Sequence, residues 1–287
     1  MSDAQSEAED PKAATARTAI RKELARDGVD DKAKARTTGA EPEAREVVAL
    51  DHVSLAFDRP ILDDISLVVR EGQTVCIVGE SGTGKSTALK LILRLLKPDS
   101  GRVLIDGEDI TNIDFEEALE VRQKMGMVFQ NAALFDSLSV FENVAYPLRE
   151  HTQMTEDEIN QRVREKLQFV DLDADQVVDL LPAELSGGMR KRVGIARAMA
   201  NNAGIMLYDE PTSGLDPLTT GTITRLIIKL QHELGVTSVV VTHDIRSANR
   251  MANAIALLHE EHITFFGTPE EMAGSDDKYI RDFLGGY

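Results

Sequence analysis

The pattern of apolar and polar positions changes at residue 47. Residues 1–46 consist mainly of Ala, Asp, Glu, Lys and Arg, and their large apolar side chains past Met1 are only Ile20, Leu24 and Val29. Such a segment cannot bury enough apolar surface to offset the entropy that it would lose on ordering. We therefore predict a disordered tail over residues 1–46 and a folded domain over residues 47–287.

Short apolar runs bounded by turn residues begin the folded part. Residues 47–57, 65–69, 74–78 and 101–105 have the length and composition of strands and hairpins. Further along, helical patterns alternate with the apolar runs 125–129, 205–208, 238–241 and 254–258. This alternation is typical of a parallel sheet flanked by helices. The pattern predicts an α/β fold with a mostly parallel core sheet and an antiparallel β subdomain.

The stretch between the strands 125–129 and 205–208 is mostly helical in pattern. Apolar spacing predicts helices over residues 139–150, 156–170 and 187–199, and the first should be interrupted at Pro147, because proline removes a helix hydrogen bond. We expect a helical insertion in the α/β core over about residues 131–200.

A glycine-rich loop separates the apolar strand 74–78 from a predicted helix over residues 86–96. Glycines let the backbone curl so that successive N–H groups and the helix N-terminus face an anion. Lys85 can reach terminal phosphates and the Ser86 hydroxyl can bind Mg²⁺. The loop predicts an ATP site made of Gly79, Glu80, Ser81, Gly82, Thr83, Gly84, Lys85, Ser86 and Thr87.

The apolar run 205–208 ends in two carboxylates, Asp209 and Glu210. Strand ends beside a phosphate loop are where Mg²⁺ is held in ATPases. We expect Asp209 to position the metal and Glu210 to orient or deprotonate the attacking water. Taken alone, the pair could equally be a solvated acidic turn before Pro211.

A second anion-binding helix start is predicted at residues 185–189, where Ser186 can cap the helix and Gly187 and Gly188 expose backbone donors. These five residues resemble the signature motif of ABC ATPases. In that family two domains meet head to tail, and each ATP lies between one chain's phosphate loop and the other chain's signature. The resemblance therefore implies a homodimer in which Ser186, Gly187 and Gly188 contact the partner's nucleotide.

Other family marks follow in the same order along residues 47–284. Gln130 resembles the Q-loop glutamine, which implies contact with Mg²⁺ and the attacking water. Residues 213–216 resemble the D-loop, which adds Asp216 to the nucleotide site, and His243 resembles the switch histidine that senses the γ-phosphate. Phe57 stands where the family places an aromatic that stacks on adenine; the alternative is a core phenylalanine.

Residues 133–150 and 181–192 are similar to the ATPase subunits of MCE-type lipid transporters, which include the Mla system. This resemblance implies an integral membrane permease and an MCE-type substrate-binding protein as partners. Leu134, Phe135 and Phe141 would then receive a coupling helix of the permease, although they could instead be a core cluster. Residues 190–192 could be a solvated basic helix face.

Composition narrows the function further. A net charge of −17 and a pI near 4.8 disfavour nucleic acid as a partner. A single cysteine, Cys76, and the lack of a bilayer-spanning apolar run favour the cytosol. The resemblance to transporter ATPases implies, in addition, a peripheral subunit at the cytoplasmic face of the inner membrane.

The prediction is thus an ATP-hydrolysing ABC transporter subunit that moves phospholipid or another hydrophobic substrate. The alternatives are an amino-acid or small-solute importer, a soluble ABC protein acting on nucleic acid or ribosomes, and a nucleotide-binding regulator without hydrolysis.

Overall fold

The computed structural model describes residues 44–285. The predicted tail over residues 1–46 therefore lies, apart from residues 44–46, outside the described part of the chain. The antiparallel subdomain is a four-stranded sheet in the order β2-β1-β4-β5. Its strands are β1 (Glu46–Ala56), β2 (Pro60–Arg70), β4 (Ser100–Ile105) and β5 (Glu108–Asp109).

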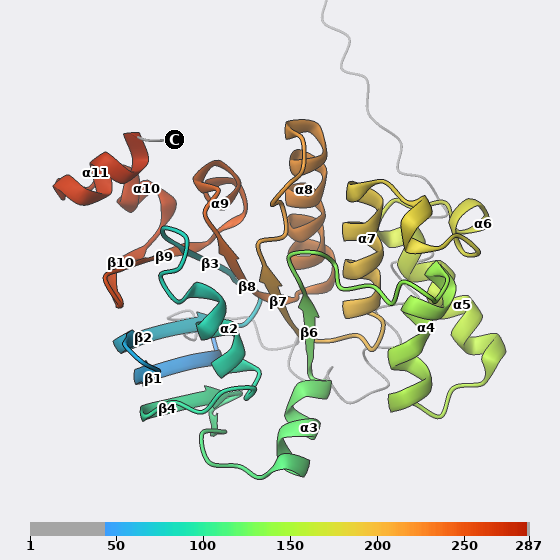
Figure 1. The fold of residues 1–287 in the computed structure, drawn as a ribbon, viewed down its shortest axis with the longest axis horizontal. Helices are drawn as coiled ribbons and strands as arrows, with labels where there is room; N and C mark the ends of the chain where they lie inside the picture. Colours follow the sequence, from blue (N-terminus) through green and yellow to red (C-terminus); the bar gives the residue numbers. More distant parts are fainter. Residues whose placement is uncertain (1–43, 286–287) are drawn as a thin grey trace, which may run out of the picture. The chain divides into compact units, whose positions relative to one another are not determined.

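The core sheet has six strands in the order β10-β9-β3-β8-β7-β6 (Figure 1). All neighbours pair in parallel except β9 and β10, which form an antiparallel hairpin at the edge. The α/β prediction, with a mostly parallel core sheet and a separate antiparallel sheet, is confirmed. The strands are β3 (Thr74–Val78), β6 (Met125–Val128), β7 (Ile205–Asp209), β8 (Thr237–Thr242), β9 (Ala254–His259) and β10 (His262–Gly267).

Helices connect these strands and cover the core sheet. The segment between β6 and β7 is helical throughout its regular structure, with α4, α5, α6, the 3₁₀ turn η1 and α7 in succession. The helices are α2 (Lys85–Ile92), α3 (Phe115–Gln123), α4 (Val140–His151), α5 (Glu156–Phe169), α6 (Ala174–Val177), η1 (Pro182–Glu184), α7 (Gly187–Ala198), α8 (Pro217–Leu234), α9 (Ile245–Met251), α10 (Pro269–Ala273) and α11 (Lys278–Gly285).

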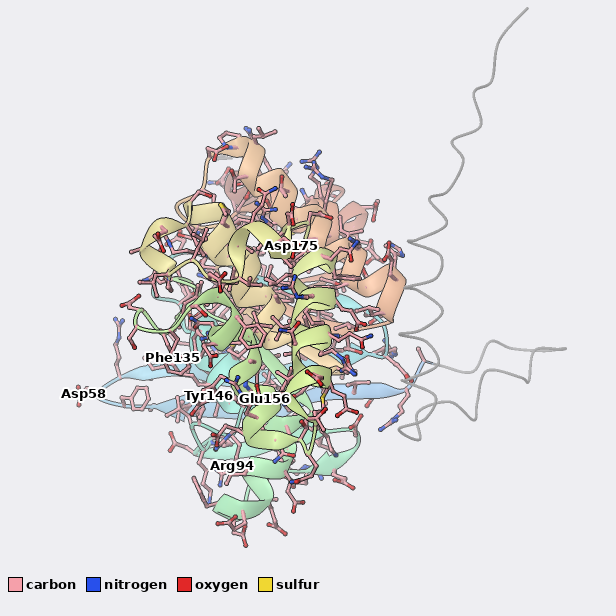
Figure 2. All side chains as sticks on the ribbon, turned by 90° about the vertical axis from the view of Figure 1, so that its right-hand side faces the viewer. Asp58, Arg94, Phe135, Tyr146, Glu156 and Asp175 are labelled. Carbon is pink, nitrogen blue, oxygen red and sulfur yellow. The ribbon has the colours of Figure 1, made fainter. Side chains whose placement is uncertain are left out.

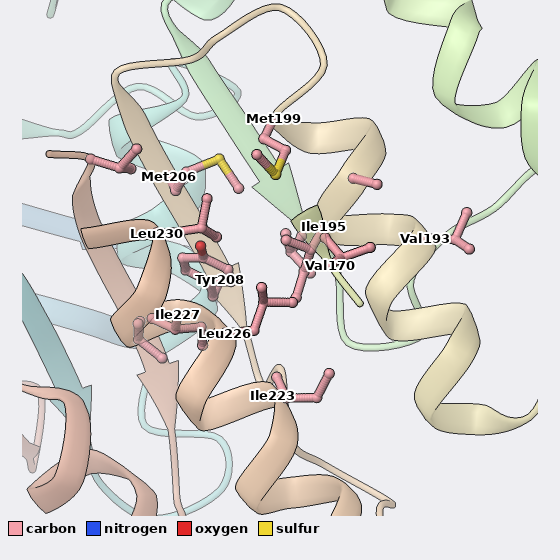
Figure 3. Packing of buried hydrophobic residues seen from close by; sticks show 14 of the residues in the cluster. Val170, Val193, Ile195, Met199, Met206, Tyr208, Ile223, Leu226, Ile227 and Leu230 are labelled. Atoms are coloured by element: carbon pink, nitrogen blue, oxygen red, sulfur yellow. The ribbon is translucent and has the colours of Figure 1, made fainter. Parts of the chain in front are cut away.

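The core sheet is buried on both faces because its strands are apolar at consecutive positions. On β3, Val75 and Ile77 pack with α2 and the antiparallel sheet, whereas Cys76 and Val78 belong to the cluster formed with α4, α5, α7 and α8. Figure 3 shows this second cluster, in which Tyr208 of β7 packs beside α8. The two clusters hold α2 and α7 on opposite faces of one rigid sheet.

Helix α4 differs from the sequence prediction in its continuity, and helix α2 differs in where it ends. Helix α4 continues through Pro147 without interruption, because its apolar stripe, including Val144 and Leu148, is fully buried against the other helices and outweighs the lost hydrogen bond. Helix α2 ends at Ile92 rather than residue 96, and Arg94 follows in a left-handed conformation with φ of 53°.

Candidate nucleotide site

The loop 79–84 connects the buried strand β3 to the start of α2. Gly79 and Gly84 have φ of 155° and 97°. A Cβ on Gly79 would lie 2.3 Å from the carbonyl oxygen of Leu258, and one on Gly84 would lie 2.8 Å from that of Ile61. Gly84 is the N-cap of α2 and makes no side-chain capping bond. The first N–H groups of α2 are therefore directed toward a place where an anion can accept their hydrogen bonds.

Lys85 is buried at the first position of α2, with 6% of its surface exposed. Its Nζ donates to the carbonyl oxygens of Gly79 at 2.9 Å and Glu80 at 2.6 Å, so the side chain folds back over the loop. Desolvation lowers the pKa of Lys85, while Glu210, Asp209 and Glu80 oppose that shift. A phosphate in the loop would supply the negative charge that this partly desolvated ammonium needs.

Ser86 and Asp209 come together from α2 and the end of β7. The Ser86 hydroxyl donates to Asp209 Oδ1 at 2.7 Å. A hydroxyl and one carboxylate are a partial ligand set of the kind that Mg²⁺ completes with water and phosphate oxygens. Within residues 44–285 no cluster of three or more His, Cys, Asp or Glu side chains could hold a metal unaided. The pair therefore fits a metal ion that arrives with a nucleotide.

Glu210 and His243 meet at the carboxyl ends of the neighbouring parallel strands β7 and β8. His243 Nδ1 lies 2.9 Å from Glu210 Oε2, and the Glu210 side chain is only 13% exposed. Glu210 adopts a left-handed backbone with φ of 49°, which is uncommon for a non-glycine residue. Its amide donates to the carbonyl oxygen of Val241 at 2.9 Å, and this bond fixes the turn that aims the carboxylate.

Gln130 follows β6, the edge strand next to β7. Its Nε2 donates to the Ser213 hydroxyl at 3.2 Å, so the segment after β6 contacts the segment after β7. Phe57, after β1, is 62% exposed, and the alternative of a core phenylalanine is therefore wrong. An exposed ring at this position is available to stack on a base.

The predicted signature residues lie apart from the loop 79–87. Ser186 caps α7 by accepting from Met189 N at 3.2 Å, and Asp216 caps α8 by accepting from two amides. Gly188 faces α8, where its Cβ would lie 2.4 Å from Thr219 Cγ2. In the described part of the chain no hydrogen bond joins Ser186 to the phosphate loop. The structure thus brings Lys85, Ser86, Asp209, Glu210 and His243 together. The starts of α7 and α8, with Ser186 and Asp216, form a second group.

Lys191 is the site residue that sequence reasoning missed. The interpretation of residues 190–192 as a solvated basic face is wrong for Lys191, which is only 5% exposed. Its Nζ donates to the carbonyl oxygens of Gln130 at 2.5 Å and Glu210 at 3.1 Å. Burial lowers the pKa of Lys191 to about 8, against the attraction of Glu210 and Asp209. No motif identified it, because the contact depends on how α7 packs on the core sheet.

A groove of about 620 Å³ lies between α3, β6, α4 and α7. Phe135 and Tyr146 line it side by side, 5.1 Å apart between ring centroids and both almost half exposed (Figure 2). Leu134 and Phe141, which the sequence grouped with Phe135, instead pack against the main core. The predicted apolar group is therefore split between core and groove.

The fold and the glycine loop beside paired strand-end carboxylates define a P-loop nucleotide-binding domain. Residues 62–213 match the family model described as ABC transporter. The chain belongs to this family.

Several relatives are similar over most of the chain. The intermembrane phospholipid transport system ATP-binding protein MlaF of Escherichia coli K12 is 42% identical over 80% of this chain and 84% of its own length. The MlaF of Haemophilus influenzae is also 42% identical, over 80% and 86%. The probable ribonucleotide transport ATP-binding protein mkl of Mycobacterium leprae is 42% identical over 79% of this chain, which spans 65% of that relative's length.

Solved structures confirm the fold. The ATP-binding cassette MJ0796, in a dimeric post-hydrolysis state with ADP and Pi, has a TM-score of 0.71 and 37% identity over 77% of this chain and 98% of that one. The protein cbiO1 of Clostridium perfringens has a TM-score of 0.74 and 29% identity over 83% and 94%. Among residues 44–285, no helix has both the length and the apolar character that crossing a membrane requires.

Proposed function

We propose that this chain hydrolyses Mg-ATP and that the hydrolysis drives phospholipid, or another hydrophobic substrate, through a separate membrane permease. The observation that carries the hydrolysis is the pair Glu210–His243, held at 2.9 Å beside the Ser86–Asp209 hydrogen bond. A regulator that only binds nucleotide has no use for a carboxylate fixed in this way.

Each residue has a role that follows from its position. The amides of the loop 79–87 and Lys85 bind the phosphates, and Phe57 stacks on the adenine. Ser86, Asp209 and Gln130 would hold Mg²⁺, which when bound neutralises charge on the phosphate oxygens.

Glu210 orients the attacking water and accepts its proton. His243 holds the Glu210 carboxylate through Nδ1 and stands at the end of β8, where it can sense the terminal phosphate.

A second copy of the chain would complete the site. Ser186, Gly187 and Gly188 begin α7 on the face of the core sheet opposite α2, and Asp216 lies beside them at the start of α8. The helix start at α7 exposes donors that have no phosphate to bind in its own chain. The dimeric state of the similar cassette MJ0796 supports a pair of chains.

The permease would contact the groove beside Phe135 and Tyr146. These aromatic rings are exposed, and the groove also includes Phe129, which directly precedes Gln130, so a helix seated there would lie close to the nucleotide site. The two MlaF relatives, which are ATP-binding proteins of an intermembrane phospholipid transport system, support a phospholipid substrate. An MCE-type protein as a further partner and a peripheral position at the cytoplasmic face of the membrane belong to the same proposal and rest on the sequence resemblance.

A second candidate substrate comes from the mkl relatives, whose name assigns them to ribonucleotide transport. Purification of the complex from native membranes, followed by identification of partner chains and bound lipid, separates the two candidates. Phospholipid with a permease supports the proposal. Purification with a permease that carries ribonucleotides or amino acids would replace phospholipid as the proposed substrate. Purification with ribosomal or DNA-bound partners alone would overturn the transport function.

The hydrolysis is tested with Glu210→Gln in the full chain. We expect ATP binding to persist, ATP-induced dimers to become more stable and turnover to fall by about 100-fold or more, since the general base is lost. Glu270→Gln, an exposed glutamate on α10, is the matched control and should turn over like the unmodified protein. Unchanged turnover of Glu210→Gln would refute the assignment.

A further inference from the structure

Lys191 connects the two loops that carry the reaction. It lies in the second turn of α7, and its ammonium group reaches the main chain after β6 and after β7 at the same time. Both acceptors are carbonyl oxygens, those of Gln130 and Glu210, so the contact fixes the backbone and leaves both side chains free to act.

The contact at Glu210 is made where the backbone adopts an unfavourable conformation. The left-handed conformation of Glu210 turns its carbonyl oxygen toward α7, where it accepts from Lys191 and also from Ser213 N at 3.2 Å. Such a conformation persists only when its surroundings hold it. Lys191 is one of the groups that do so, together with the Val241 carbonyl that accepts from the Glu210 amide.

The other basic residues of α7 donate to other carbonyl oxygens. Arg190 donates to the Leu185 carbonyl and Arg192 to the Asp171 carbonyl, at 2.5 and 2.6 Å. Arg197 donates to the carbonyls of Ala132 and Ala133, both at 2.8 Å. The Lys191 contact with both Gln130 and Glu210 is therefore a particular feature of one position, and Arg192 is a neighbour of similar chemistry whose partner lies away from the nucleotide.

We infer that Lys191 is a positioning residue for ATP hydrolysis, which sets the backbone geometry of Gln130 and Glu210 from the helix that begins with Ser186. The inference rests on the proposed function. Because α7 is one continuous helix, a phosphate bound at its N-terminus would shift the position of Lys191. Lys191 in turn holds the chain's own catalytic loops. Lys191 then connects the start of α7, which would bind the partner's nucleotide, to the catalytic loops that act on the chain's own nucleotide.

Lys191→Met tests this inference, because methionine has a similar length and cannot donate. In the full chain we expect kcat to fall at least tenfold, with KM and the ATP dissociation constant changed less than about threefold. The melting temperature of each variant shows whether a loss of folded protein accounts for the fall. Lys191→Gln, whose side chain is too short to reach both carbonyl oxygens, is the second variant and has the same expectation.

Arg192→Met is the matched control and should keep kcat within about twofold. An unchanged kcat in the Lys191 variants, an equal fall in Arg192→Met, or a fall explained by lost folded protein would overturn the inference. If the unmodified chain hydrolyses ATP, Glu210→Gln does not, and Lys191→Met does so at the unmodified rate, only the role of Lys191 is refuted. No ATP turnover in any of them would instead refute the proposed function.

Discussion

Replacing Gly188 by alanine should destabilise the protein through one contact that a second substitution can relieve. A Cβ at Gly188 would lie 2.4 Å from Cγ2 of Thr219 on α8. Thr219 cannot rotate away freely, because its hydroxyl donates to Asp216 Oδ2 at 2.6 Å and its amide donates to Oδ1 at 3.1 Å. The clash therefore presses α7 against the capped start of α8.

The magnitude follows from the size of the overlap. Carbon atoms pack at about 3.5–4.0 Å, so the contact is short by more than about 1 Å. Overpacking of this kind costs about 1–3 kcal/mol, and a helical Gly→Ala change returns up to about 1 kcal/mol. We expect the free energy of unfolding of Gly188→Ala to fall by about 1–2 kcal/mol.

The free energy of unfolding is measured by urea denaturation of the full chain and its variants. Gly187→Ala is the control, because its Cβ would lie 3.6 Å from Leu215 Cδ2, an ordinary contact, and should change stability little. Thr219→Ser removes Cγ2 and keeps the hydroxyl, so adding it to Gly188→Ala should recover about 1 kcal/mol. Equal losses in Gly187→Ala and Gly188→Ala, or no recovery with Thr219→Ser, would refute the reasoning.

Two further predictions concern Lys85 and Asn143. Lys85→Ala should weaken ATP binding at least about tenfold, since a hydrogen bond from a charged group contributes roughly 1.5–3 kcal/mol. Calorimetric titration measures it against Lys90→Ala, on the exposed side of α2, and equal affinity in both variants would contradict the role of Lys85. Asn143 is fully buried and donates to the carbonyls of Phe135, Leu138 and Ser139, so Asn143→Leu should lower the free energy of unfolding by about 3 kcal/mol or more. Thermal denaturation compares it with the exposed Asn249→Leu, and equal stability of the two would show that the buried hydrogen bonds contribute nothing.

Much of the local structure could be predicted because it depends on neighbours in the chain. The strand 74–78, the loop after it and the helix starting near Lys85 follow from one run of apolar residues and one run of glycines. The helix starts at Ser186 and Asp216 are likewise visible in the sequence, since each residue caps the helix that follows it directly.

The parts that escaped prediction depend on packing between distant segments. The order of the six core strands comes from crossovers that apolar patterning does not encode. Pro147 remains inside α4 because of tertiary burial, and Lys191 is buried because α7 lies across the ends of β6 and β7. A basic triplet on a helix is usually solvated, so only the fold distinguishes Lys191 from its neighbours.

The hydrogen bonds from α7 to residues 130–133 have a consequence for how the groove and the nucleotide site are coupled. Lys191 holds the Gln130 carbonyl, Arg197 holds those of Ala132 and Ala133, and the Arg197 guanidinium lies 5.7 Å from the ring centroid of Phe135. In the proposed transporter, a displacement of Phe135 by the permease and a displacement of Gln130 by the nucleotide would act on the same short segment. Lys191 and Arg197 attach this segment to the single helix α7. Permease binding in the groove and ATP binding at the nucleotide site would then be coupled directly through these few residues, and no conformational change elsewhere in the domain would be needed.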